Sequence, residues 1–215
     1  MACGGAARLP PVMIWTGPNH SREPLPPMPV FPLPHLASAR LRLRLLAAAD
    51  APLLFGIYSD PAVMRYWSTP PWAEMSQAET HIAEAQAAYA AGTGLTFGIE
   101  QNADHRLIGT CQFYQINDPC RRAELGYALA KSAWGQGVMH EALTLLIGHG
   151  FGALGLNRIE ADIDPRNTAS AACLERLGFT KEGHLRERWI VAGEVSDSGL
   201  YGLLQRDWLK VRGEA

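Results

Sequence analysis

One stretch constrains the fold of this chain more than any other: Glu124 to Glu141, which reads E-L-G-Y-A-L-A-K-S-A-W-G-Q-G-V-M-H-E. It joins a strand over about 122–129 to a turn that holds Gly135 and Gly137, and then to an apolar helix. Glycine lets a ligand approach the backbone closely, and the first turn of a helix leaves N–H groups unpaired at the positive end of the helix dipole. The stretch therefore predicts a pyrophosphate site, although an ordinary tight connection explains the two glycines equally well.

A second stretch, Asp164 to Phe179 (D-P-R-N-T-A-S-A-A-C-L-E-R-L-G-F), predicts a short helix with both ends capped. Asn167 is suited to the N-cap, where its side chain accepts a hydrogen bond from the backbone N–H of Ser170. Gly178 supplies a left-handed C-cap. Taken alone, this pattern indicates a well-capped helix and no particular chemistry.

The element order along the chain is β-α-α-β-β-β-α-β-α-β-β, which predicts an α/β (α+β) fold. We expect a mixed, strongly twisted central sheet of about six to seven strands with helices on both faces. Asp50 is expected to cap the first helix, and Ser76 with Glu79 to form a capping box for the second. The strands are expected near 41–45, 95–100, 106–114, 122–129, 159–163, 179–191 and 196–205.

Prolines divide the chain, because nine of the fifteen lie within residues 1–38. Proline fixes φ and has no backbone N–H, so this segment cannot join a helix or a central strand. We expect residues 1–38 to form a proline-rich, disordered tail and residues 39–211 to form one domain. Translation from Met28 rather than from Met1 stays open.

Composition argues against several classes of protein. The formal net charge of −2, without a long Lys/Arg cluster, argues against a nucleic-acid partner. The four cysteines lack zinc-ligand spacing, so reduced thiols and no metal are expected. No stretch approaches the roughly 20 apolar residues of a membrane span, and prolines interrupt the N-terminal segment too early for a signal peptide. The expected protein is soluble and cytoplasmic and has no membrane partner.

Taken together, the motifs resemble those of the GNAT superfamily of N-acetyltransferases, and most of all its ribosomal-protein-alanine N-acetyltransferase subgroup. The W-G-Q-G turn is followed about thirty residues later by N-x-x-S and then by L-G-F-x-x-E-G. The segments S-A-R-L-R-L-R, D-P-A-V-M-R-Y-W and A-E-L-G-Y agree as well. The resemblance covers about Ala37 to Trp208. It implies a GNAT-like fold, acetyl-CoA as co-substrate and acetyl transfer to a primary amine.

The resemblance also implies which residues bind acetyl-CoA. The backbone at the end of the strand would bond the pantetheine arm, the turn and helix start would hold the pyrophosphate, and the next helix start would line the thiol end. In chain order these residues are Tyr127, Ala128, Leu129, Gly135, Gln136, Gly137, Val138, Met139, His140, Asn167 and Ser170. The sequence departs from the family pattern at Ala133 and Met139, but neither change removes a backbone donor.

Glu124 is the candidate catalytic base. Acetyl transfer needs an uncharged amine, so a base must take the amine proton directly or through water. Glu124 lies on the strand that the resemblance places beside the cofactor, and the subgroup often has a Glu at this point. The structural alternative is an ion pair with Arg121, Arg122 or Arg158.

Ser170 is the candidate acid or thiolate stabiliser, and a helix-capping hydroxyl is its alternative. Leu174 stands where many family members carry a tyrosine that protonates the thiolate, so a tyrosine acid at this place is not expected. His81 is expected on the exposed face of its helix. The other histidines considered lack an evident partner, namely His140, His149 and His184.

The amine acceptor is open between a protein or peptide N-terminus and a small molecule such as an amino acid, a polyamine or an antibiotic. A non-catalytic acyl-CoA-binding domain is a third alternative, and a homodimer stays open. The acceptor site is expected at the first two helices and the last hairpin, including Arg65, Tyr66, Trp67, Arg186, Arg188 and Trp189.

Overall fold

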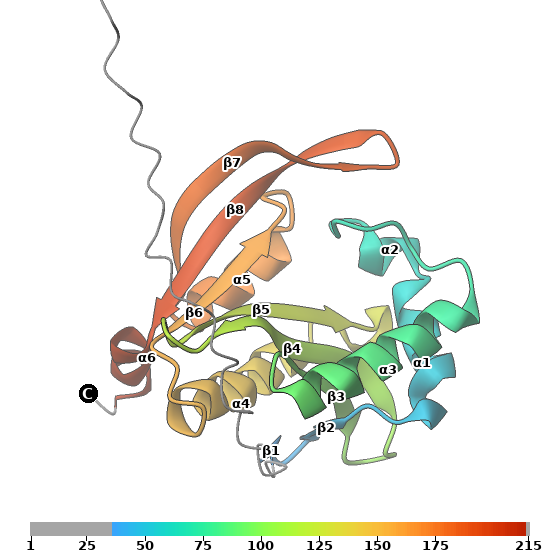
Figure 1. The fold of residues 1–215 in the computed structure, drawn as a ribbon, viewed down its shortest axis with the longest axis horizontal. Helices are drawn as coiled ribbons and strands as arrows, with labels where there is room; N and C mark the ends of the chain where they lie inside the picture. Colours follow the sequence, from blue (N-terminus) through green and yellow to red (C-terminus); the bar gives the residue numbers. More distant parts are fainter. Residues whose placement is uncertain (1–35, 214–215) are drawn as a thin grey trace, which may run out of the picture.

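The computed structural model describes residues 36–213 and contains one eight-stranded sheet in the order β1-β2-β3-β4-β5-β6-β8-β7 (Figure 1). The strands are β1 (Leu36–Ala37), β2 (Leu41–Leu45), β3 (Leu95–Gln101), β4 (Leu107–Asn117), β5 (Arg122–Leu129), β6 (Arg158–Ile163), β7 (Thr180–Val191) and β8 (Glu194–Leu204). The helices are α1 (Ala51–Tyr58), α2 (Pro61–Met64), α3 (Met75–Ala91), α4 (Val138–Gly152), α5 (Thr168–Arg176) and α6 (Gln205–Arg212). The sheet is mixed as predicted, with slightly more strands than expected, and only β5 and β6 pair in parallel.

Two apolar clusters cover the two faces of the sheet, because side chains alternate between faces along a strand. In β5, Ala123 and Leu125 belong to the cluster that includes Leu143 of α4. Ala128 belongs instead to the cluster that includes Leu54 of α1, together with residues of α3. Helix α4 therefore covers one face, and α1 and α3 cover the other.

The two parallel strands separate soon after they meet. β5 and β6 pair at only three positions, the last of which joins Glu124 to Glu160. Beyond this point residues 125–129 still pair with β4 but have no strand partner on the β6 side. We call this opening, bordered by 125–129 and 161–163, the fork. Backbone N–H and C=O groups that face the fork lack sheet partners and are available to a ligand.

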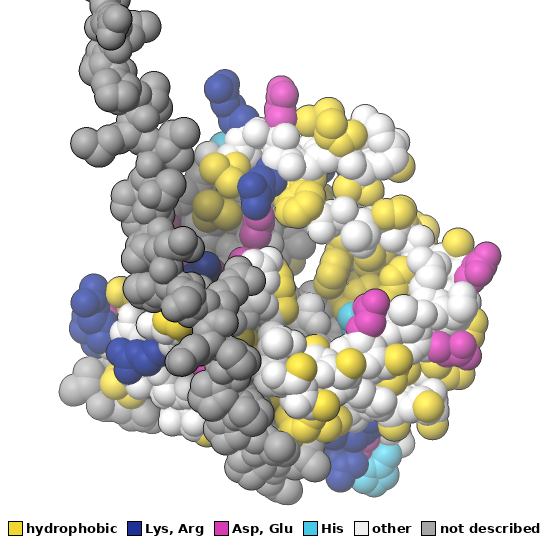
Figure 2. Space-filling view, viewed as in Figure 1, with side chains coloured by type: hydrophobic (Ala, Val, Ile, Leu, Met, Phe, Trp, Pro, Cys, Tyr) yellow, Lys and Arg dark blue, Asp and Glu magenta, His cyan; other side chains and the backbone are white. Residues whose placement is uncertain are grey.

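Strands β7 and β8 form a long hairpin whose outer half extends beyond the sheet toward α2 (Figure 1). Their pairing is interrupted between Leu185 and Trp189, and Glu187 has a φ of 53° within the interruption. At the tip, Ala192 and Gly193 have φ values of 48° and 85°. The molecule is hollowed between this hairpin and the part that carries the first helices, and hydrophobic atoms line the hollow (Figure 2).

The start of α1 differs from the prediction. Asp50 precedes the helix, but its side chain makes no capping hydrogen bond. The carboxylate accepts instead from Arg44 at 2.7 Å and from the Ala47 backbone N–H at 2.7 Å. An ion pair with a neighbouring strand has therefore replaced the local cap.

Other boundaries also differ. The capping box of α3 is formed by Glu74 and Gln77 rather than by Ser76 and Glu79. Helices α2 and α6 were not predicted. Strand β1 lies inside the segment expected to be a tail and pairs with β2, whereas the remainder of that segment, residues 1–35, lies outside the described residues.

Candidate active site

The turn before α4 leaves its backbone open. Gly135 and Gly137 have left-handed φ values of 73° and 72°, and Gly137 is the N-cap of α4. A Cβ at Gly135 would meet no atom within 4 Å, and one at Gly137 would meet only the Arg40 guanidinium at 3.9 Å. The first intrahelical bond runs from the Glu141 N–H to the Gly137 carbonyl, so the preceding N–H groups have no helical acceptor. Free donors, the positive helix end and open space suit an anion.

Three side chains hold this turn. The Trp134 indole donates to the Leu129 carbonyl at 2.8 Å, and the Gln136 amide donates to the Ser132 carbonyl at 2.9 Å. Arg40 donates to the Gln136 carbonyl at 3.1 Å. Because the Gln136 side chain is bonded back to the turn, Gln136 would contact a ligand through its backbone.

A groove of about 650 Å³ runs beside the start of α4. It is lined by Ser38, Arg40, Gly137, His140, Glu141, Thr144, Leu145 and Arg176. Burial favours a raised pKa for Glu141, but hydrogen bonds from Ser38 and Arg40 outweigh it and hold the pKa below its usual value. Arg176 forms no salt bridge within residues 36–213, so its charge is available to an anion. No local pattern pointed to Arg40 or Arg176, because the groove joins distant segments.

Three residues predicted to bind the cofactor, 127–129, lie in the part of β5 that has no strand partner on the β6 side. One of them, Tyr127, contacts α5. The Tyr127 phenol oxygen is 2.6 Å from the Ser170 hydroxyl oxygen. The Asn167 side chain accepts from the Ser170 backbone N–H at 3.1 Å, which confirms the predicted N-cap. Burial raises the pKa of Tyr127. Tyr127 was expected to act through its backbone, and the structure adds a contact between its side chain and Ser170.

Glu124 occupies the last paired position before the fork. It is half-buried, and no arginine or lysine in the described part of the chain forms an ion pair with it. Arg122 pairs with Glu160 at 2.5 Å, and Arg158 pairs with Glu160 and Glu182. The ion-pair alternative for Glu124 is therefore wrong.

Glu124 has a phenol beside it instead. Tyr114 faces Glu124 across the β4–β5 pairing. Burial, and then the charge and hydrogen bonding of the Glu124 carboxylate, raise the pKa of Tyr114. Since Glu124 and Tyr127 are three residues apart on one strand, their side chains lie on opposite faces of the sheet. The candidate base and the hydroxyl pair therefore approach the fork from opposite sides.

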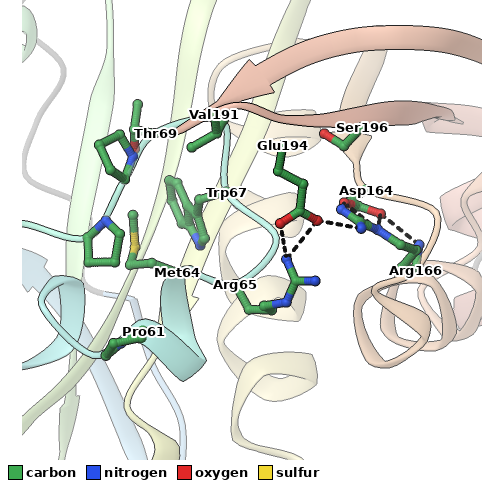
Figure 3. A pocket seen from close by; sticks show the side chains of 12 residues that line it. Pro61, Met64, Arg65, Trp67, Thr69, Asp164, Arg166, Val191, Glu194 and Ser196 are labelled. Carbon is green, nitrogen blue, oxygen red and sulfur yellow. Dashed lines mark hydrogen bonds and ion pairs between the residues drawn. The ribbon is translucent and has the colours of Figure 1, made fainter.

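A second pocket, of about 210 Å³, lies between α2 and the tip of the hairpin (Figure 3). We call it the hairpin pocket. It is lined by Pro61, Met64, Arg65, Trp67, Thr69, Pro70, Pro71, Asp164, Arg166, Val191, Glu194 and Ser196. Two of the predicted acceptor residues, Arg65 and Trp67, are among them.

A row of four charges closes one side of the hairpin pocket. Glu194 accepts from Arg65 at 3.0 Å and from Arg166 at 2.6 Å (Figure 3). Arg166 also pairs with Asp164 at 2.6 Å. The hydrogen bonds from Arg166 and Arg65 lower the pKa of Glu194. The Tyr66 ring lies 5.5 Å from the Arg65 guanidinium and 5.9 Å from that of Arg166. The row links the hairpin tip to α2 and to the β6–α5 loop.

Two predicted acceptor residues on β7 are held by the sheet beneath them. The Trp189 indole donates to the Ser198 hydroxyl at 3.0 Å. The Arg188 guanidinium is 3.8 Å from the Asp162 carboxylate. One anchor, Ser198, lies on β8 and the other, Asp162, lies on β6, so these contacts tie the outer half of the hairpin to the sheet.

Two histidines, His81 and His184, differ from expectation. His81 is half-buried rather than exposed, its Nε2 atom has no hydrogen-bond partner among the described residues, and burial lowers its pKa. His149 lacks a hydrogen-bond partner for its Nε2 atom among the described residues, as expected, and burial lowers its pKa. His184 has a partner after all, because its Nε2 atom is 2.8 Å from the Asp197 carboxylate.

Within residues 36–213, no group of His, Cys, Asp and Glu side chains is arranged to hold a metal ion. No helix in the same range is long and apolar enough to cross a membrane. The cysteines in this range, Cys111, Cys120 and Cys173, form no disulfide.

Comparisons with known proteins agree on one family. The acetyltransferase (GNAT) domain family matches residues 40–180. The uncharacterized N-acetyltransferase p20 of Bacillus licheniformis is 38% identical over 173 residues, which cover 80% of this chain and 97% of that relative. The ribosomal protein uS5-alanine N-acetyltransferase of Escherichia coli (strain K12) is 31% identical over 118 residues, covering 54% of this chain and 61% of that protein.

A solved structure shares the fold. It is that of spermidine N-acetyltransferase from Vibrio cholerae in complex with CoA and spermine. The match has a TM-score of 0.72 and 24% identity, and it covers 80% of this chain and 99% of that chain.

Proposed function

From the premise that this chain belongs to the GNAT acetyltransferase family and is an N-acetyltransferase, we propose that it moves the acetyl group of acetyl-CoA to the N-terminal amine of a protein or peptide. The observation that carries this proposal is the fork beside the open glycine turn. Together they offer unpaired strand backbone for the pantetheine arm and unpaired helical N–H groups for the pyrophosphate.

The residues present fit acetyl-CoA. Its pyrophosphate would lie on the backbone from Gly135 to His140, where added Cβ atoms at the two glycines would occupy otherwise open space. The nucleotide end would enter the groove lined by Arg40 and Arg176. Arg40 is paired with Glu141, so Arg176, which forms no salt bridge within residues 36–213, would supply the unpaired charge for a phosphate. When bound, the thioester supplies an activated acetyl carbon.

In this proposal Glu124 receives the amine proton. A carboxylate paired with arginine is a weakened base, because the neighbouring cation favours its charged form. Glu124 has no such partner among residues 36–213, and it lies where the strand pairing ends and the fork begins. An amine approaching from the face of α1 and α3 would meet this carboxylate directly or through one water.

On the opposite face, Ser170 lies at the N-terminus of α5, where the helix dipole favours negative charge. Ser170 is the sequence candidate for the acid or thiolate stabiliser, and its hydroxyl lies 2.6 Å from the Tyr127 phenol oxygen, so either hydroxyl can serve this end of the site. Asn167 fixes the position of this helix start through its capping hydrogen bond. The sulfur of CoA would therefore leave toward a site that stabilises an anion.

The acceptor enters, in this proposal, through the hollow between α2 and the hairpin. The hairpin pocket offers an apolar wall with Met64 and Trp67 and a charged wall with Arg65 and Glu194, which suits a peptide end better than a purely polar ligand. The uS5-alanine acetyltransferase among the relatives supports this choice. A small-molecule amine is the alternative, and the spermine-bound protein of the same fold is its precedent.

One assay distinguishes these alternatives. The purified chain is incubated with acetyl-CoA and a panel of N-terminal peptides, amino acids, polyamines and aminoglycosides, while released thiol is measured. Turnover on peptides whose α-amine is free, and its loss when that amine is blocked, is the expected result. Faster turnover on a polyamine would select the small-molecule alternative. Binding of acetyl-CoA without turnover on any amine would indicate a non-catalytic domain.

The free thiols agree with a reducing, cytoplasmic setting, which we include in the proposal.

A further inference from the structure

The hydroxyl pair at the fork has no explanation in helix capping. The Tyr127 and Ser170 oxygens are 2.6 Å apart, so one of them donates to the other. The N-cap of α5 is Asn167, whose side chain satisfies the Ser170 backbone N–H. The Ser170 hydroxyl therefore does not cap the helix, and its hydrogen-bond partner among the described residues is the phenol of Tyr127.

Helix α5 itself supplies no phenolic acid. Leu174, one turn beyond Ser170, is fully buried in the apolar core. Tyr127 reaches the same helix from β5, on the limb of the fork that would carry the pantetheine arm. A phenol is thus present at this end of the site, although it comes from a different element.

The surroundings of Tyr127 suit a proton donor. Burial raises its pKa most, and Cys173 and Tyr201 act in the same direction, so the phenol keeps its proton at neutral pH. The hydrogen bond to Ser170 acts in the opposite direction, because it stabilises the phenolate. An acid that is neutral at rest and has a partner for its conjugate base is the arrangement that general acid catalysis needs.

We infer that Tyr127 is the acid of the acetyl transfer and that Ser170 positions it, an assignment that rests on the proposed function. The amine nitrogen forms a bond to the acetyl carbon as the carbon–sulfur bond breaks. The amine proton passes to Glu124, and the phenol proton of Tyr127 passes to the CoA sulfur. The Ser170 hydroxyl donates to the resulting phenolate. Exchange with water then returns a proton to Tyr127 and removes one from Glu124.

Tyr127→Phe tests the assignment, because it removes the phenolic proton and keeps the ring. We expect kcat to fall about 100-fold, at the lower end of general acid effects since a thiolate is already a stable leaving group. KM for acetyl-CoA should stay near its wild-type value. The second readout is the pKa of the CoA thiol on the enzyme, followed by the ultraviolet absorbance of the thiolate. Loss of a donor to a charged sulfur should raise that pKa by about one to two units.

Three controls separate chemistry from structure. Desulfo-CoA should bind to wild type and to Tyr127→Phe equally, since it lacks the sulfur. Ser170→Ala should reduce kcat less than Tyr127→Phe, because the acid remains. Tyr58→Phe removes an equivalent buried phenol, bonded to the Thr110 hydroxyl at 2.8 Å on the other face of the sheet. It should lower stability as much as Tyr127→Phe does and leave turnover and the thiol pKa unchanged.

The outcomes are distinct. If Tyr127→Phe turns over normally and leaves the thiol pKa unchanged while wild type binds CoA, the role of Tyr127 is refuted and the proposed function stands. If Ser170→Ala alone is impaired, the acid is Ser170 and the assignment is again overturned. If wild type neither binds CoA nor releases thiol, the proposed function itself fails, and the assignment fails with it.

Discussion

Replacing Gly137 by valine separates ligand binding from folding, because the free protein has open space around an added Cβ at this position. The nearest atom to an added Cβ is a guanidinium nitrogen of Arg40 at 3.9 Å, the end of a flexible side chain. The cost to the free protein is then mainly the left-handed φ of 72°, about 1–2 kcal/mol or somewhat more for a β-branched residue. For a domain of this size this corresponds to a fall in Tm of roughly 2–8 °C.

The expected cost to binding is larger. The valine side chain would occupy the space over the first N–H groups of α4, where we place the pyrophosphate. Loss of one charge-assisted hydrogen bond costs about 1.5–3 kcal/mol, which corresponds to roughly 10- to 150-fold in Kd. Isothermal titration calorimetry with acetyl-CoA measures this change directly.

Gly155 provides the matched control. Its φ is 62°, and an added Cβ would meet no atom within 4 Å, so Gly155→Val carries the same backbone strain away from the turn. Both variants should lose similar thermal stability, and Gly137→Val alone should lose affinity. Wild-type affinity in Gly137→Val, with Tm lowered as in the control, would refute the placement of the pyrophosphate.

Three further predictions follow from other features. Glu124→Gln should lower kcat by about 10²–10⁴-fold with acetyl-CoA affinity retained, and the rise of rate with pH should move up to the pKa of the amine; a variant with normal turnover would remove Glu124 as base. A chain that starts at Met28 should melt within a few degrees of the full chain, and a large fall in Tm would show that the removed residues stabilise the fold. Burial lowers the folded-state pKa of His81, so below about pH 6.5 the unfolded chain binds more protons and stability should fall as the pH falls. His81→Gln should flatten this slope in urea titrations at pH 5–7, and an unchanged slope would assign the effect elsewhere.

Local features were predictable because a few neighbouring residues determine them. The left-handed glycines at 135 and 137, the Asn167 cap and the bounds of β5 all follow from short patterns. Asp50 failed as a cap because Arg44, on a strand, outcompetes the helix N–H groups for its carboxylate. No local propensity reports such a contact.

In the candidate site as well, features set by neighbouring residues were predictable and features set by tertiary contacts were not. The pattern of the chain indicated the turn and the helix starts, but the fork depends on where two strands stop pairing, and that depends on their tertiary surroundings. The bond between Tyr127 and Ser170 joins residues 43 positions apart. The groove likewise brings Arg40 and Arg176 to one helix start. Contacts between residues so far apart leave no periodic pattern in the sequence, so only the three-dimensional structure shows them.

In our proposal, the fork couples the folding equilibrium to the binding of acetyl-CoA. Residues 125–129 have no strand partner on the β6 side, and in our proposal the pantetheine arm lies along them and supplies hydrogen bonds to this edge of β5. A ligand that binds only the folded state stabilises it by about 2.7 kcal/mol at a hundredfold excess over Kd. The gain should concentrate at the fork, so hydrogen exchange of the amides in 125–129 should slow with acetyl-CoA far more than that of β3 amides. The cell's supply of acetyl-CoA would then set how stably this protein is folded as well as how fast it works.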